Sequence, residues 1–492
     1  MKEQTEPYQA METDSLFNLN RWGLPIEAIE TLAQRLHHIW LRFHHCFTTQ
    51  TRDTSEYAFI YLRGLLEMDT KRNYANIARR VISPDNDGQN IQQFMSDSPW
   101  EARDVFRQIQ SEIAKRGKLS GGMLTLDESG DQRAGDKSAG AARQYIGRLG
   151  KVDLGQVSVV LGYSHADIWA MVDAELFLPQ VWFTKKYAAL RKRWHVPIDR
   201  VFATKAQLGL EMIKQAKEQK LPFEIVSCDS FYGRDHDFRA NLAALNLLYI
   251  ADIPSDTEVY TSEPVVGIPK KRRGKRGRKP MRIRVLNGLN SIKVSTLGYE
   301  MTFQPIEVRH TERGVLIDTC AARCVCTVTD SGIVQKEWLF VRQESDESQS
   351  FSLSNAQGQT PLGQLAFWRS QRYFAERTFQ DAKTEAGWDE LVARKYRAFM
   401  HHTALDALAL WFVAETKLDW ADKYPRDASL SEQLFVEKLP QLSMANLREL
   451  LKAVMPLEQF SPEQAVQLVV RHLVARSHST RCRLKGQQRT PP

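Results

Sequence analysis

The sequence predicts an α/β fold in which a mixed sheet follows a helical N-terminal region. Three features of its 492 residues lead to this prediction. Apolar residues first recur at steps of three and four, as on the buried face of a helix. From Gly121 they gather in short runs rich in valine, leucine and aromatic residues, which is typical of strands. Helical and strand-like segments then alternate, and this order places helices on the faces of a sheet.

Composition narrows the class of protein. Hydrophobic residues make up 42% of the chain and charged residues 26%, which is ordinary for globular domains and excludes a wholly disordered chain. Six cysteines are too few for a disulfide framework and suggest a reducing compartment. The N-terminus is polar, unlike a secretory signal. The longest apolar stretch, 404–414, is far shorter than the roughly 20 residues that span a bilayer. We therefore expect a cytosolic or nuclear protein.

Changes of pattern divide the chain into six regions. Residues 1–20 are expected to be a disordered leader, 21–118 a helical domain and 119–254 the first part of the α/β core. Residues 255–345 are expected to be a β-rich insertion, 346–415 the helical continuation of the core, and 416–492 a helical region with a basic tail. Within the core and insertion, strands are predicted over 123–127, 156–163, 169–178, 223–229, 248–253, 292–295, 303–309, 315–319, 323–328 and 338–342, and helices over 204–219 and 235–245.

The helical domain contains a possible helix-turn-helix. One helix has Ile77, Ala78 and Val81 on its apolar face, the turn-forming run 83–88 follows, and a second helix buries Ile91 and Phe94. An ordinary helical hairpin has the same pattern. The second helix would expose amide side chains that can pair with adenine in a major groove, namely Gln89, Asn90, Gln92 and Gln93.

Positive charge is concentrated in one segment. Residues 270–284 contain ten bases and no acid, and without them the net charge of +8 would be −2. The tail from Arg471 is also free of acids. Localised charge of this kind favours a polyanion, most often nucleic acid, although a solvated loop would have the same composition. A flexible loop that contacts phosphates is favoured over a minor-groove hook at 276–280. The bases in question are Lys270, Lys271, Arg272, Arg273, Lys275, Arg276, Arg278 and Lys279, followed by Arg282 and Arg284.

Three acids stand out by position. Asp127 is predicted to end the first strand, before the turn-like Glu128-Ser129-Gly130, and Asp229 to end the strand 223–229. Acids at strand ends lie where a sheet presents residues to a ligand, although a single Asp there is usually a helix cap. At 100° per residue, a helix through 372–383 places Arg372, Glu376 and Lys383 on one stripe. An intrahelical ion pair between Arg372 and Glu376 is the simpler explanation of part of this stripe.

Three carboxylates and two cations suit phosphodiester chemistry. Carboxylates can hold two Mg²⁺ ions roughly 3.5–4 Å apart, which activate water or a 3′-hydroxyl and stabilise the leaving oxygen. A zinc site at Cys320, Cys324 and Cys326 with His310 is disfavoured, because their spacing matches no common zinc finger. No Gly-rich phosphate loop is present, so nothing supports dependence on ATP.

The order of these residues resembles a DDE transposase of a bacterial insertion sequence. Asp127, Asp229 and the pattern Arg-x3-Glu-x6-Lys from Arg372 match the signature of the insertion sequence 4 superfamily. The strings Leu126–Gly130, Ala142–Tyr145, Asp229 with Tyr232-Gly233, Leu353–Ala356 and Glu376–Asp389 resemble its 701-type group. The resemblance covers roughly residues 20–415. Arg369 stands where the signature has Tyr, beside Trp368, which puts the family's DNA-hairpin step in doubt.

The resemblance implies an RNase H-like core in which Asp127, Asp229 and Glu376 hold Mg²⁺, with Mn²⁺ as a possible substitute. It implies that Arg372 and Lys383 contact the DNA backbone near the cut end, with Arg369 beside them. The expected activity is cut-and-paste transposition. The helical domain binds the terminal inverted repeats, the core cleaves both ends, and the 3′-hydroxyls are joined to target DNA by a homodimer in the bacterial cytoplasm, at the nucleoid. The alternatives are a non-catalytic DNA-binding derivative and a simple nuclease with the same core.

Overall fold

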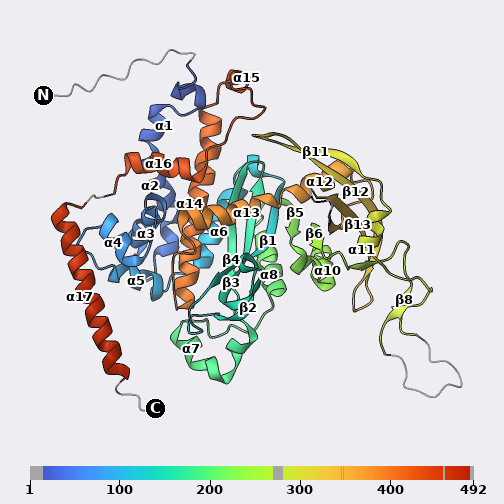
Figure 1. Cartoon of the computed structure of the whole chain (residues 1–492), viewed down its shortest axis with the longest axis horizontal. Coiled ribbons are helices and arrows are strands. Elements are labelled where there is room, and N and C mark those ends of the chain that lie inside the picture. The colour runs from blue at the N-terminus through green and yellow to red at the C-terminus, as the bar shows by residue number, and fades with distance from the viewer. Residues whose placement is uncertain (1–14, 270–280, 345, 347, 458–459, 488–492) are drawn as a thin grey trace.

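The computed structural model describes residues 15–269, 281–344, 346, 348–457 and 460–487 (Figure 1). The predicted helical domain is helical, and Asn73 caps its fourth helix by accepting from the Asn76 backbone. A 3₁₀-helix at Leu19–Trp22 begins in the predicted leader and continues past its end at residue 20; residues 1–14 of that leader lie outside the described residues. The helices are α1 (Ile26–Glu30), α2 (Leu32–Phe43), α3 (Ser55–Glu67), α4 (Tyr74–Val81), α5 (Gln89–Ser96) and α6 (Ala102–Ala114).

The core is a mixed sheet with helices on both faces. Its strands lie in the order β4-β3-β1-β5-β6. β1 pairs with β5 and β5 with β6 in parallel, whereas β3 is antiparallel to both β1 and β4. The short β2 (Ala142–Ile146) pairs with the start of β3. The bounds are β1 (Gly122–Gln132), β3 (Lys151–His165), β4 (Ile168–Leu176), β5 (Phe223–Cys228) and β6 (Leu248–Ile253), with α7 (Ala188–Arg193), α8 (Lys205–Glu218) and α10 (His236–Ala244) between them.

The predicted insertion, 255–345, joins the same sheet through β14, a strand that was not predicted and that lies in the region expected to be helical. β14 pairs antiparallel with β6, and the order then runs β14-β13-β12-β11. Two predictions were wrong here. The segments 315–319 and 323–328 form one strand, since β12 keeps continuous pairing with β13. Only Ile292–Lys293 (β10) of 292–295 is a strand, paired with β7 (Glu258–Val259), and α11 (Val294–Tyr299) follows. The remaining strands are β8 (Val266–Gly267), β9 (Arg284–Val285), β11 (Gln304–Thr311), β12 (Gly314–Val328), β13 (Val334–Gln343) and β14 (Gln349–Ser354).

The C-terminal part is helical. The helix expected through 372–383 is interrupted: α12 (Leu362–Ser370) ends before Arg372, α13 (Tyr373–Gln380) begins after it, and a π-helical turn occupies Asp381–Ala386. The long helix α14 is buried over most of its length. The helix α17 runs beside α4 and α5 (Figure 1), where Arg471 pairs with Asp85 at 2.5 Å. The bounds are α14 (Tyr396–Lys423), α15 (Ser429–Gln433), α16 (Met444–Val454) and α17 (Pro462–Gln487).

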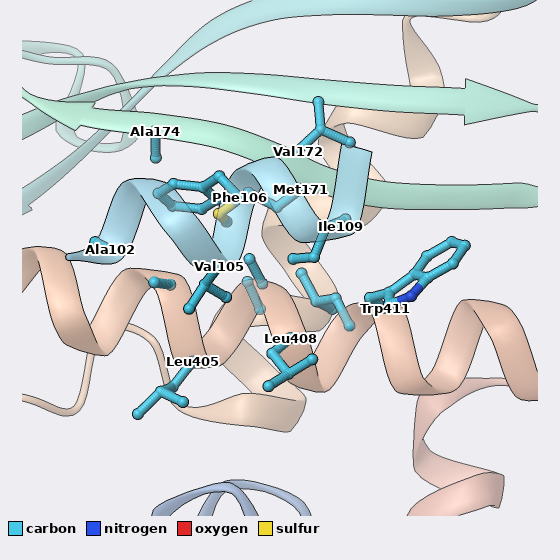
Figure 2. Packing of buried hydrophobic residues seen from close by; sticks show 14 of the residues in the cluster. Ala102, Val105, Phe106, Ile109, Met171, Val172, Ala174, Leu405, Leu408 and Trp411 are labelled. Atoms are coloured by element: carbon cyan, nitrogen blue, oxygen red, sulfur yellow. The ribbon is translucent and has the colours of Figure 1, made fainter. Parts of the chain in front are cut away.

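The main hydrophobic core joins the helical domain to the sheet. Figure 2 shows α6 and α14 packed together against β4, with Phe106 of α6, Met171 of β4 and Leu408 of α14 among the buried contacts. The apolar stretch 404–414 therefore lies in a central helix. No helix in the described ranges is long and apolar enough to cross a membrane.

The two faces of β1 serve different helices. Leu126 faces α8 closely, since a Cβ at Gly209 of α8 would lie 2.3 Å from its Cδ2. Met123 points to the other face and packs in a cluster with Leu365 and Trp368 of α12. Because side chains alternate along a strand, the odd-numbered residues of β1, including Asp127, face α12 and α13.

Candidate active site

Three aspartates lie in one row across adjacent parallel strands. Leu126 is paired with Cys228, and Cys228 with Ala251. The next residue on each strand is therefore Asp127, Asp229 or Asp252. Neighbouring strands lie about 4.8 Å apart, so this register places three carboxylates side by side. The first two were predicted as site residues, and Asp252 was not.

The prediction that Asp127 ends its strand was wrong. β1 continues to Gln132, and Glu128, Ser129 and Gly130, which suggested a turn, lie inside it. The strand continues because antiparallel pairing with β3 extends to Gln132, past the last residue that pairs with β5. Asp127 nevertheless lies one residue beyond the parallel β1–β5 pairing. At Asp127, the edge of β1 that faces β5 is therefore no longer paired with a strand.

Asp229 immediately follows β5 and caps a short helix. Its Oδ1 accepts hydrogen bonds from the backbone N–H groups of Phe231 at 3.0 Å and Tyr232 at 3.3 Å, at the start of α9 (Ser230–Gly233). The cap fixes the carboxylate at the end of the strand. Asp229 can therefore cap α9 and face the row of acids at the same time.

Arg372 connects the row of acids. Its Nη1 lies 2.7 Å from Asp252 Oδ2, and its Nη2 lies 3.7 Å from Asp127 Oδ2. Burial acts against its charge, yet Asp252, Asp127 and Asp229 together raise the pKa of Arg372 above its ordinary value. Arg372 is therefore a permanent cation at the centre of the site.

The carboxylates of Asp127 and Asp229 are destabilised by their surroundings. Burial raises the pKa of Asp127 to about 6, the nearby Asp229 adds to the rise, and Arg372 opposes it. Burial likewise raises the pKa of Asp229, again against the effect of Arg372. Two desolvated carboxylates that repel each other are stabilised by a divalent cation, and carboxylate oxygens are the ligands that Mg²⁺ prefers. The donor set formed by Asp127 and Asp229 therefore fits such an ion.

Glu376 lies on the helix that covers this face. α13 is held against the sheet by Phe374, whose ring stacks on Trp169 at 5.6 Å, and by Thr378, which lies over Gly162 of β3. The Glu376 side chain is exposed. Within the described ranges, no three His, Cys, Asp or Glu side chains are arranged to hold a metal ion. The three-acid set of Asp127, Asp229 and Glu376 stays a prediction.

Lys383 also faces β1, although the helix changes form before it. Its Nζ lies 3.7 Å from Asp131 Oδ1, four residues along the strand from Asp127. Lys383 belongs to the π-helical turn Asp381–Ala386, a form that often occurs at functional sites. Arg372 and Lys383 therefore stand at the two ends of α13, each next to an acid of the same strand face.

Arg369 is turned away from solvent. Its Nε pairs with Asp252 Oδ1 at 2.6 Å, and its side chain is 13% exposed. Burial lowers the pKa of Arg369, and the neighbouring Arg342 and Arg372 contribute to the decrease. The residue at the Tyr position of the family signature thus neutralises an acid in this structure.

The residues predicted to bind DNA away from the row of acids form two groups, the amides of α5 and the bases of 270–279. The four amide residues of α5 are all exposed. The loop between α4 and α5, residues 82–88, is longer than the three or four residues usual in a helix-turn-helix. Asn90 and Gln93 line a hollow of about 190 Å³ together with Thr49 and Arg52. The basic residues Lys270, Lys271, Arg272, Arg273, Lys275, Arg276, Arg278 and Lys279 lie outside the described residues.

Gly233 sets how closely α9 approaches β6. A Cβ there would lie 1.9 Å from the backbone oxygen of Asp252. Gly233→Ala should force α9 from β6 and displace Asp229 and Asp252 together. We expect a loss of about 1–3 kcal/mol in the free energy of unfolding, measured by urea titration. Gly117→Ala, where the added Cβ meets nothing within 4 Å, is the control and should stay close to the wild type. Equal stability of the two variants would show that α9 can move without cost.

Comparison with known proteins identifies the family of the chain. The family model described as "DDE superfamily endonuclease" matches residues 42–315, more than half of the chain. This range contains Asp127 and Asp229 and ends before Glu376. A probable transposase for insertion sequence element IS701 from Microchaete diplosiphon is 29% identical over 203 residues, which are 40% of this chain and 49% of that protein. The alignment thus covers about half the length of this curated relative. Because this family model matches more than half of the chain, the chain belongs to the DDE superfamily of endonucleases.

Proposed function

We propose that the protein is a DNA transposase that cleaves the ends of its own mobile element and joins the 3′-hydroxyls to target DNA. The observation that carries this proposal is the pair Asp127 and Asp229, held in register around Arg372 beneath the helix that bears Glu376. The strand order β4-β3-β1-β5-β6, with β3 antiparallel, supports an RNase H-like core. The likeness to an insertion-sequence transposase supports mobile-element DNA as the substrate.

In this proposal Asp127, Asp229 and Glu376 hold divalent metal, Mg²⁺ or Mn²⁺. Two such ions supply an activated water or 3′-hydroxyl and stabilise the leaving oxygen of an in-line displacement. The chain's own cations have a separate task. Arg372 and Lys383, whose side chains are 21% and 19% exposed, border the acids and would hold the phosphates on either side of the scissile bond.

The helical domain would bind the terminal inverted repeats through α5, and two copies would act on the two ends. The exposed amides Gln89, Asn90, Gln92 and Gln93 support base reading. The test is a plasmid that carries the gene with several hundred flanking base pairs, incubated with Mg²⁺ and the protein, with Asp229→Ala beside it. Double-strand breaks at defined flanking positions, absent with the variant, are the expected result. Breaks without joined products would favour a simple nuclease, and binding without breaks a non-catalytic derivative.

The basic segment gives a second expected outcome. Replacing the eight Lys and Arg residues of 270–280 by Gln should make the dependence of log K on log salt shallower, by about 0.9 for each phosphate that the protein no longer neutralises. The measurement is DNA binding by fluorescence anisotropy across a salt series. Lys217→Gln with Lys220→Gln, at exposed sites at the end of α8, is the control. An unchanged slope would show that the segment does not bind phosphates.

A further inference from the structure

Asp252 lies in the row of acids, but its environment differs from that of the other two. It is an inner residue of β6, buried, and level with Asp127 and Asp229. Its Oδ1 accepts a hydrogen bond from Ser352 Oγ at 2.7 Å and pairs with Arg369. Its Oδ2 accepts from Arg372 Nη1 at 2.7 Å. Both carboxylate oxygens are thus engaged by groups of the protein, which makes Asp252 a poor metal ligand.

The distances show which acid holds Arg372. The guanidinium lies 2.7 Å from Asp252 but 3.7 Å from Asp127. Arg372 Nε is buried and, in the part of the chain that the structure describes, has no hydrogen-bond partner. Nothing on that side fixes the side chain, so the contact with Asp252 is its principal anchor. Without this anchor, the nearest remaining negative charges are those of Asp127 and Asp229.

A guanidinium that moved onto Asp127 and Asp229 would compete with a divalent cation for the same oxygens. We infer that Asp252 is a positioning residue that holds Arg372 beside Asp127 but beyond hydrogen-bond distance of it, so that Asp127 and Asp229 stay available to metal while Arg372 stays available to phosphate. The inference rests on the proposed function. It also assigns Arg369 a task, because this second cation offsets the charge of Asp252 and limits its repulsion of Asp229.

The test measures metal binding by the full chain without DNA. Free Mn²⁺ is followed by electron paramagnetic resonance during titration of the protein. Asp252→Asn should raise the Kd for Mn²⁺ about tenfold, as is typical when a residue that orients a metal site is changed. Asp318→Asn is the matched control, since Asp318 is also paired with an arginine and its side chain is 11% exposed against 12% for Asp252. The control should stay within about twofold of the wild type, less than that tenfold effect.

Two double variants separate the positioning of Arg372 from general damage to the site. Each removes one acid and one arginine, so the net charge of the buried cluster is kept and the test can still be made if Asp252→Asn alone fails to fold. Asp252→Asn with Arg372→Gln removes the competing cation and should restore wild-type Mn²⁺ affinity. Asp252→Asn with Arg369→Gln leaves Arg372 free to move and should keep the weakened affinity. Equal Mn²⁺ affinities in the two double variants would overturn the inference.

The single variants distinguish the role of Asp252 from the existence of the metal site. Wild-type affinity in Asp252→Asn, alongside lost binding in Asp127→Asn, would overturn the role of Asp252 and leave the proposed metal site intact. Absence of Mn²⁺ binding by the wild type would overturn the proposed metal site and the inference together.

Discussion

Replacing Glu376 by Gln is expected to lower the rate of Mg²⁺-dependent end cleavage by about a hundredfold to a thousandfold, the scale on which a single group that stabilises transition-state charge acts. The change keeps the size of the side chain and removes only its charge. Because Glu376 is exposed on α13, folding should be unaffected. The measurement is the single-turnover cleavage rate on the mapped end, with thermal unfolding and DNA binding measured on the same preparations.

This variant tests whether Glu376 belongs to the same site as Asp127 and Asp229. Asp127 and Asp229 are brought together by strand register, whereas Glu376 lies on α13, so its approach to them depends on how α13 packs on the sheet. Glu218→Gln, an exposed carboxylate on α8 at the other face of the sheet, should cleave as the wild type does. Full cleavage by Glu376→Gln would remove this residue from the metal-binding set.

Replacing Trp411 by Ala should remove about 3–5 kcal/mol from the free energy of unfolding. Trp411 is completely buried in α14, where it packs with α6 beside β4 (Figure 2). Its Nε1 donates to Glu112 Oε2 at 2.7 Å, and Arg42 donates to both oxygens of that carboxylate. The substitution therefore opens a cavity and also takes a donor from a buried acid. Urea unfolding followed by far-ultraviolet circular dichroism measures the loss.

Trp411→Phe separates the two contributions. It keeps most of the ring volume and removes the donor to Glu112, whose Oε2 still accepts from Arg42 Nη2 at 3.0 Å. A loss of about 1.5–3 kcal/mol is expected, the usual contribution of a hydrogen bond to a charged group. If alanine were no worse than phenylalanine, packing of α14 against α6 would contribute little, and the helical domain would be only loosely attached to the sheet.

Much of the fold follows from local pattern. The strand at 248–253 and the helix at 204–219 were predicted to within one residue, because the strand is a short apolar run and the helix has apolar residues at helical spacing. The errors came where pairing overrode local signals. Glu128-Ser129-Gly130 has the composition of a turn but lies inside β1, since β3 offers a partner along its whole length. Likewise, β12 continues through 320–322 because β13 pairs with it there.

The site was predicted in part for a related reason. Asp127 and Asp229 are conspicuous in the sequence because each follows an apolar run, and resemblance to a family ties them to Glu376. Asp252 is the single charged residue in the apolar run Leu248–Ile253. An acid inside a predicted buried strand is the one sequence signal that could have identified it. Its role depends on β6 lying next to β5 and on Arg369 and Arg372 arriving from more than 100 residues away.

The sequence by itself determined the order of the main strands and helices between residues 123 and 253, the candidate acids and the concentration of positive charge, because these depend on neighbours along the chain. Only the tertiary structure decided that the insertion extends the core sheet, that Arg372 joins Asp127 to Asp252, and that Arg369 is buried. These features arise from strand register and helix packing between distant segments. The stability of these ion pairs and strand pairings depends on which groups folding buries next to each other. The spacing of residues along the chain does not show which groups those are.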